Sequence, residues 1–149
     1  MYADTITLFN RYDTGAGDVW FPTVLKGVDL NVDKAAIIAK YGENSGDNAR
    51  LHIRCGIDDG AITVGDKTYL PPKVWKTQSR NQAASSVTFA SGQSFDFFVV
   101  GEWGDTGAIS DDDYLEGFYS FCNNVYDFCF AITSVAMYSV IPHFEIMAK

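Results

Sequence analysis

Three consecutive carboxylates, Asp111, Asp112 and Asp113, stand in the segment AISDDDYLEGFYSF at 108–121, just before several aromatic residues. Such acids can hold a metal ion, act as an acid/base cluster, begin a helix or face a partner. On a helix, neighbouring side chains diverge by about 100°, so three in a row cannot converge on one ion or one bond. The calcium-loop pattern also fails, because it needs acids at alternate positions followed by Gly, and position 115 is Leu.

The same aspartates fit the first turn of a helix better. Ser110 is a good N-cap, and Asp113 follows three residues later, where a short acid can imitate a capping box. The helix dipole favours negative charge in that turn. An apolar stripe at three- and four-residue spacing follows, made of Tyr114 or Leu115, Phe118, Cys122 and Val125. We therefore expect one substantial helix from Ser110, with an acidic edge that can face a partner.

Histidine and cysteine spacing gives no catalytic or metal motif. His52 and His143 are the candidate bases, but both fall on polar faces of expected strands, outside any HxxxH, GxSxG or HExxH context. His52 and Cys55 resemble an HxxC ligand pair, yet odd spacing on a strand points them to opposite sides. Gly15 and Gly17 lack the GK[ST] sequence of a phosphate-binding loop. We expect no catalytic residue, no cofactor, no metal ligand and no enzyme; a glycosidase-like carboxylate pair remains the alternative.

The composition predicts one folded domain, residues 1–149. The chain is 47% hydrophobic and 15% aromatic, which is enough to bury a core at this length. Its three cysteines are odd in number and form no CxxC pair, which favours a reducing compartment. The segment MYADTITLFNRYD has neither a basic leader nor an apolar stretch, so we expect no secretion. The longest mainly apolar run, 128–140, is too short to cross a bilayer, so we expect no membrane contact.

The charge of the chain limits its partners. The formal net charge is −8 at pH 7, which argues against the clustered Lys and Arg that grip phosphates. Sequence-specific DNA binding is therefore not expected. An acidic wall can still serve beside nucleic acid, because it repels a strand that must slide past without sticking. The comparatively basic stretch is Lys73, Lys76 and Arg80.

Alternation of apolar and polar residues predicts most of the chain to be β-strand. The candidate segments are TITLFNRY (5–12), VWFPTVLKGVDLNVDK (19–34), ARLHIRC (49–55), AITVGDKTYL (61–70), SFDFFVVGEW (94–103), FCFAITSV (128–135), AMYSVIP (136–142) and HFEIMAK (143–149). In the second of these, Leu25 falls on the face opposite Val28, Leu30 and Val32. A bulge near Lys26 and Gly27 would bring them together.

The connecting segments complete a mainly β domain. We expect one or two helical turns at 34–40, a polar loop at 42–48, and a hairpin with Gly65 and Asp66 at its tip. Residues 76–91 are predicted to form a long exposed loop with a short strand at 87–89. The fold class expected is mainly β with one substantial α-helix, as a small β-barrel or rolled antiparallel sheet with the helix packed on it.

Six segments carry a resemblance that spans nearly the whole chain. They are DTITLFNRY (4–12), TVLKGVDLNVDKAAIIAKYG (23–42), ITVGDKTYLPPKVW (62–75), DFFVVGEW (96–103), SDDDY (110–114) and YSVIPHFEIMAK (138–149). Together they resemble a family of unassigned function encoded in virion-structure gene clusters of tailed phages and prophages of gut Firmicutes. The resemblance implies a virion structural protein that assembles in the cytoplasm of the bacterial host.

The order of the elements is also similar to that of phage head-closure, or head-tail joining, proteins. The shared features are an early strand pair, a GDKTY-like hairpin and a last strand that returns to the barrel; residues 76–108 are extra. This similarity implies a homo-oligomeric ring between the portal or adaptor protein and the tail proteins, with packaged DNA passing through. A gating loop is expected at 76–91 or 43–48.

The implied ring interface would recruit exposed strand edges, aromatic side chains and charges. The candidate interface residues are Trp75, Lys76, Arg80, Trp103, Asp111 and Asp112. The alternatives within the same class are a tail terminator and another neck or decoration protein.

Overall fold

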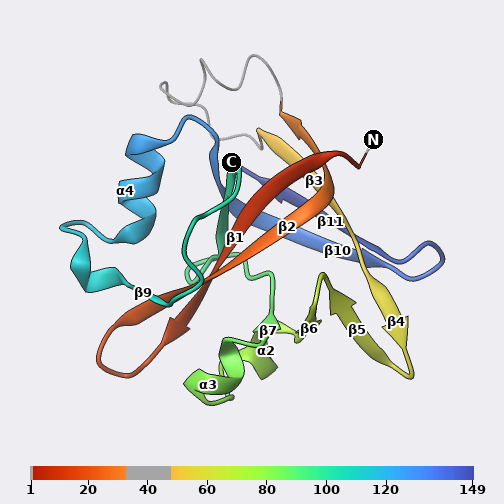
Figure 1. The fold of residues 1–149 in the computed structure, drawn as a ribbon, viewed down its shortest axis with the longest axis horizontal. Helices are drawn as coiled ribbons and strands as arrows, with labels where there is room; N and C mark the ends of the chain where they lie inside the picture. Colours follow the sequence, from red (N-terminus) through yellow and green to blue (C-terminus); the bar gives the residue numbers. More distant parts are fainter. Residues whose placement is uncertain (1, 33–47) are drawn as a thin grey trace.

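A computed structural model describes residues 2–32 and 48–149, and a closed barrel of six antiparallel strands lies at its centre (Figure 1). The neighbouring strands in order are β1, β8, β10, β11, β3 and β2, and the pairing of β2 with β1 closes the barrel. Their bounds are β1 (Asp4–Asp13), β2 (Asp18–Val32), β3 (Ala49–Arg54), β8 (Phe97–Val100), β10 (Cys129–Tyr138) and β11 (His143–Ala148). The prediction of a mainly β small barrel is confirmed. The helix predicted at 34–40 and most of the loop predicted at 42–48 lie outside the described residues.

Alternate apolar residues on the strands fill the barrel. Leu51 and Ile53 of β3 and Phe144 and Ile146 of β11 are buried in one continuous core, as their alternation predicts. Burial of such a side chain contributes roughly 1.5–3 kcal/mol. The opposite faces of these two strands carry polar residues, so His52 lies outside the barrel while Cys55 packs against its core.

Strand β2 pairs with β1 and β3 because a bulge bends it at Gly27. Lys26 and Val28 pair with consecutive residues of β1, which leaves Gly27 as the extra residue. Its φ of +70° lies in the left-handed region that glycine adopts readily. The bulge brings both Leu25 and Val28 into the core, and the predicted position of the bulge is confirmed.

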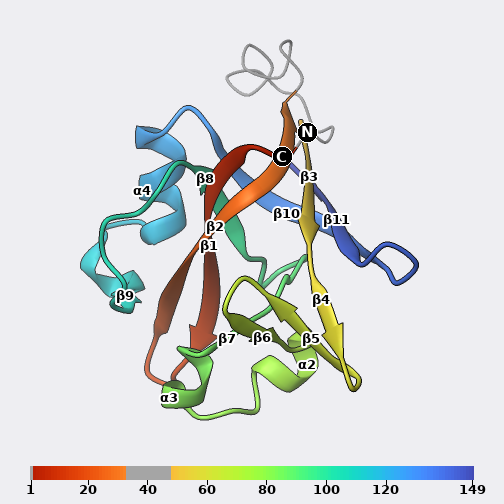
Figure 2. The ribbon, with the colours of Figure 1, turned by 45° about the vertical axis from the view of Figure 1, so that its right-hand side comes forward.

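A smaller sheet lies beside α2 (Pro72–Trp75) and α3 (Arg80–Ala83), beneath the barrel in the view of Figure 2. Its strands are β4 (Gly56–Asp58), β5 (Ala61–Val64), β6 (Lys67–Tyr69) and β7 (Ser86–Val87). The β5–β6 hairpin has Gly65 and Asp66 at its tip, as predicted.

The prediction of a long exposed loop at 76–91 is partly wrong, because this segment contains helix α3. The helix begins with a capping box, in which the Ser79 hydroxyl accepts from Gln82 N–H and the Gln82 side chain accepts from Ser79 N–H. Thr88 and Phe89, farther on, are almost completely buried. The S-x-x-Q spacing is typical of a helix start. It predicts the helix better than the polar composition of the segment, which suggested a loop.

The single helix predicted from Ser110 is also wrong, because the chain divides there into three elements. They are β9 (Ile109–Ser110), the 3-10 turn η1 (Asp111–Asp113) and α4 (Phe118–Val125). Ser110 pairs with β2, and its side chain makes no capping hydrogen bond. Gly117, with a φ of +94°, separates the turn from the helix.

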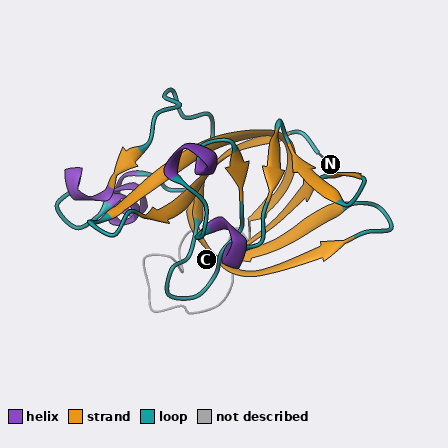
Figure 3. Cartoon of the chain, turned by 90° about the horizontal axis from the view of Figure 1, so that it is seen from below, coloured by secondary structure: helices purple, strands orange, loops and turns teal. Residues whose placement is uncertain are grey.

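The helices are short, and strands are the main secondary structure of the fold (Figure 3). In the predicted stripe of α4, Phe118 and Cys122 are buried against Phe9 and Phe97 of the barrel, as expected. Val125 is exposed, however, because α4 ends there. Within the described parts of the chain, no helix has the length and apolarity to cross a membrane.

Candidate functional site

The two tryptophans of the predicted interface pack inside the subunit. Trp75 is 3% exposed, lies edge-on to Phe21, and donates from Nε1 to the Arg11 carbonyl at 3.0 Å. Trp103 is half-buried and packs edge-on against Phe9 and Phe118. These side chains hold α2 and the 101–107 segment to the barrel, so Trp75 presents almost no surface to a partner.

The predicted charged interface residues are dispersed over the molecule. Lys76 follows α2 and Arg80 begins α3, and both are exposed. Figure 1 shows these two helices on the lower side of the molecule. Asp112 is exposed on η1, next to α4. The structure therefore does not gather the predicted set into one surface.

Asp111 is engaged within the subunit. Its Oδ1 accepts from Trp20 Nε1 and from the backbone N–H of Phe118, each at 2.9 Å. The carboxylate therefore caps the amino end of α4 and joins that helix to β2. Sequence reasoning placed Asp111 in the first turn of a helix; it instead caps the following helix from a separate turn.

One exposed apolar surface lies on and beside α4. We call Leu115, Phe121 and Val125 the α4 patch. Leu115 is fully exposed, and a shallow groove of about 180 Å³ runs between Leu115 and Phe121. Phe121 and Val125 are one helical turn apart, so they share a face of α4. Exposed apolar side chains grouped beside a groove mark a candidate surface for binding another protein.

A second exposed apolar surface lies at the turn between β10 and β11. We call Tyr138, Val140 and Ile141 the hairpin tip. Val140 is 95% exposed and Ile141 is 76% exposed. Turns normally carry polar residues, so two adjacent exposed aliphatic side chains mark this turn as a second candidate contact surface.

The α4 patch and the hairpin tip lie at opposite ends of the long axis of the molecule. Figure 1 shows α4 at the left and the β10–β11 turn at the right, and Figure 2 shows the same separation. The two surfaces therefore cannot cover each other within one subunit.

A buried carboxyl lies immediately before β8. Asp96, which is 1% exposed, accepts from Arg11 N–H at 2.8 Å, Ala90 N–H at 2.9 Å and Asn10 Nδ2 at 3.0 Å. Burial raises the pKa of Asp96 to about 7, although the three donors and the Arg11 charge act in the opposite direction. Because both oxygens already accept hydrogen bonds, the carboxyl connects β1 to the segment before β8.

A cavity of about 600 Å³ adjoins this carboxyl, lined by Arg11, Asp18, Thr88 and Asp96 among others. The Arg11 guanidinium lies over the rings of Trp20 and Phe95, 4.6 and 5.1 Å from their centroids, and pairs with Asp18 at 3.3 Å. Three acids, Asp13, Asp18 and Asp96, line this cavity, and Arg11 pairs with Asp18. The alternative of an enzyme that acts through carboxylates stays a prediction.

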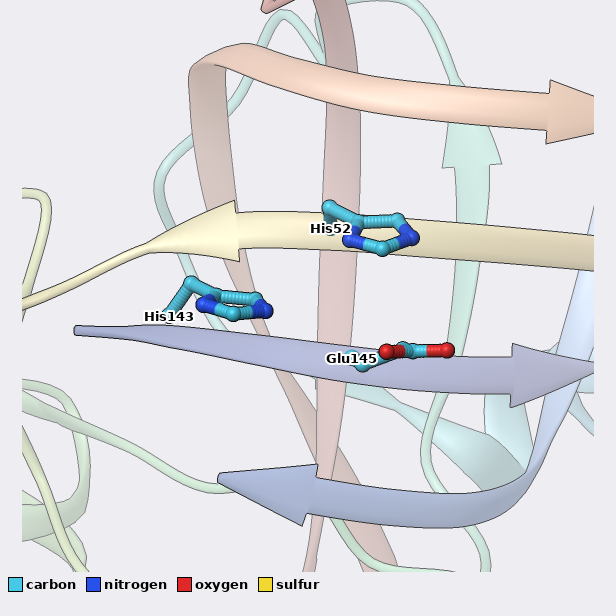
Figure 4. Close-up of side chains that lie close together, drawn as sticks. All are labelled: His52, His143 and Glu145. Atoms are coloured by element: carbon cyan, nitrogen blue, oxygen red, sulfur yellow. The ribbon is translucent and has the colours of Figure 1, made fainter. Parts of the chain in front are cut away.

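A group of potential metal ligands was missed by sequence reasoning. His52, His143 and Glu145 each offer one ligand atom, and these atoms lie within 4.8 Å of one another (Figure 4). The two histidines are 91 residues apart, so no local motif links them. The sequence predicts only that both histidines lie on polar strand faces. That they are neighbours follows from the pairing of β3 with β11.

Comparison with known proteins identifies the family of the chain. None of the curated proteins and none of the solved structures compared with it matches. One family model covers residues 1–149, and the chain therefore belongs to the family of unknown function DUF6751.

Proposed function

We propose that this protein is a structural component of a tailed-phage virion, a head-closure subunit that forms a ring between the portal and the tail. The observation that carries the proposal is the pair of exposed apolar surfaces at opposite ends of the subunit. The resemblance of six segments to a family from virion-structure gene clusters supports a role in the virion.

Two different surfaces at opposite ends favour a head-to-tail contact between copies. In such a contact the hairpin tip of one subunit packs against the α4 patch of the next. Repetition of one heterologous contact gives a closed ring if the rotation between subunits closes, and a filament if it does not. A two-fold dimer of antiparallel subunits would instead make the tip–patch contact twice and would close at two copies.

The barrel and the charge suit a ring that surrounds DNA. The strands of the closed barrel are paired around the whole circumference, which suits a subunit of defined shape. A net charge of −8 disfavours tight binding to phosphates, so DNA can slide past without being held.

Native mass spectrometry and cross-linking at high protein concentration test the contact. We expect the wild type to form oligomers, and the double variant Val140→Asp/Ile141→Asp to remain monomeric because it places two charges in an apolar interface. Ser139→Asp is the matched control, since it adds a charge to the same exposed turn without removing an apolar side chain. Equal oligomers from all three proteins would contradict a contact through the hairpin tip.

Cryo-microscopy of virions tests the position of the protein. We expect a ring of this chain in the neck, below the portal. A ring at the top of the tail tube would favour a tail terminator, and density on the capsid lattice would favour a decoration protein. A chain that is absent from purified particles would contradict a virion role.

A further inference from the structure

Two antiparallel strands bring a two-histidine, one-carboxylate set together on the outside of the barrel. Glu145 of β11 lies directly opposite His52 of β3, and His143 precedes Glu145 by two residues on the same face. Figure 4 shows the two imidazoles and the carboxylate side by side on these neighbouring strands. All three residues are partly buried, so each has one side toward protein and one toward solvent.

The spacing is close to that of a zinc site. Ligand atoms at roughly 2.0–2.2 Å from a tetrahedral zinc ion lie about 3.3 Å from one another. The three side chains have ligand atoms within 4.8 Å, and their strand backbones already fix the faces from which they approach. Rotation of the His52 and Glu145 side chains toward His143 would close the remaining gap.

One imidazole is already held in the form that binds a metal. His143 Nδ1 lies 2.7 Å from the carbonyl oxygen of Ile141. A carbonyl only accepts, so Nδ1 carries the proton and the lone pair of the neutral ring is on Nε2. Metal-binding histidines commonly donate their other ring N–H to a carbonyl in this way. The His143 ring also stacks on Tyr138, with centroids 4.9 Å apart, which limits its rotation.

The charged residues around the three side chains permit a cation to bind. Arg50 Nε is 3.9 Å from Glu145 Oε1, a long contact to a guanidinium that is half exposed. Arg54 lies over the Tyr2 ring, 4.1 Å from its centroid. Asp29 of β2 pairs with His52 in the sheet, which brings a second acid near that histidine. A bound metal would displace Arg50 from Glu145 without breaking any buried ion pair.

We propose that His52, His143 and Glu145 form a binding site for a divalent transition-metal ion, with Zn²⁺ as the best match. Two imidazoles and one carboxylate are a common ligand set for zinc, and solvent can supply the fourth position. The site joins β3 to β11 next to the hairpin tip. Its ligands all come from one subunit, so metal binding does not require the proposed ring, although Tyr138 and Ile141 of the hairpin tip contact His143.

Isothermal titration calorimetry with ZnCl₂ on the purified full chain tests the site. We expect one ion per subunit, and a loss of affinity of at least about tenfold for His52→Gln, His143→Gln or Glu145→Gln, since even outer-shell changes cost 10–100-fold. Glu116→Gln removes an exposed acid near α4 and is the matched control. Arg50→Gln should tighten binding, because it removes the competing cation from Glu145.

Cobalt substitution separates this site from a thiol site. Co²⁺ bound to nitrogen and oxygen lacks the strong near-ultraviolet thiolate band that cysteine ligands give, so we expect visible bands alone. Cys55→Ser should leave them unchanged. Absence of stoichiometric binding, equal affinity in the three ligand variants, or loss of binding on replacing Cys55 would each overturn the proposal.

Discussion

At the scale of single residues, Asp96 ties together parts of the chain that are distant in sequence. Its two oxygens receive N–H groups from Asn10, Arg11 and Ala90, which fixes β1 against the segment that enters β8. Burial of the carboxyl works against its ionised form, whereas the donors favour it. The raised pKa of Asp96 means that burial has the larger effect.

Asp96 should make the protein less stable as pH rises. Its pKa is 3.8 in the unfolded chain and about 7 in the folded one, so folding retains a proton between these values. This contribution is fully present below pH about 4 and is lost as pH rises through about 7, by at most about 1.4 kcal/mol per pH unit. Urea unfolding of the wild type and Asp96→Asn across pH 4–8 measures the difference. A difference that is constant with pH would show that Asp96 is ionised in the folded protein.

Asp111 should contribute more stability than its neighbours. Asp111→Ala removes the acceptor of both Trp20 Nε1 and Phe118 N–H, so we expect a loss of about 1–3 kcal/mol in the free energy of unfolding. Asp113→Ala, at an exposed position of the same turn, should change it by less than about 0.5 kcal/mol. Urea denaturation followed by tryptophan fluorescence compares the two. Equal losses would mean that charge at the turn matters more than the two hydrogen bonds.

At the scale of elements, the bulge in β2 depends on a glycine. Gly27→Ala forces a side chain into the left-handed region and should cost about 1–2 kcal/mol. The nearest atom to an added Cβ there is 3.9 Å away, so the cost is conformational and not steric. Gly104→Ala is the control, because its backbone is not left-handed and an added Cβ meets nothing within 4 Å. Thermal or urea unfolding of both variants tests the difference; similar values would contradict a required left-handed bulge.

The elements that could be predicted from the sequence are those in which one face is buried along its whole length. Alternation identified β1, β3 and β11, and the break in alternation located the bulge at Gly27. The prediction of one helix from Ser110 is wrong because two features of the sequence conflict. Three aspartates and Ser110 have the composition of a helix start, but Ser110 is held by the sheet and Gly117 interrupts the chain.

The surfaces and the ligand set were predictable only in part. Hydrophobicity cannot distinguish a buried apolar residue from an exposed one, so Leu115 and Val125 were assigned to the packed face of a helix. The metal ligands depend on which strands are neighbours, and His52 and His143 meet only because β3 pairs with β11. Alternation predicts the strand face of each histidine, whereas the pairing of β3 with β11 brings the two together.

At the scale of the whole molecule, the position of the two apolar surfaces determines which assemblies are possible. Each subunit offers one hairpin tip and one α4 patch, on opposite ends of its long axis. A contact between unlike surfaces leaves one free surface at each end of any open chain of subunits. Growth therefore stops only when a ring closes or when a subunit with a damaged surface is added.

Mixing two defective variants tests this arrangement directly. Val140→Asp/Ile141→Asp loses the hairpin tip but keeps the α4 patch, and Leu115→Asp/Phe121→Asp has the converse defect. Each variant alone should be monomeric. Their mixture should form a one-to-one dimer and nothing larger, because a single pair of intact surfaces remains, and analytical ultracentrifugation measures this. If the tip instead pairs with a tip and the patch with a patch, each variant alone would form dimers, and mixing would add no new species.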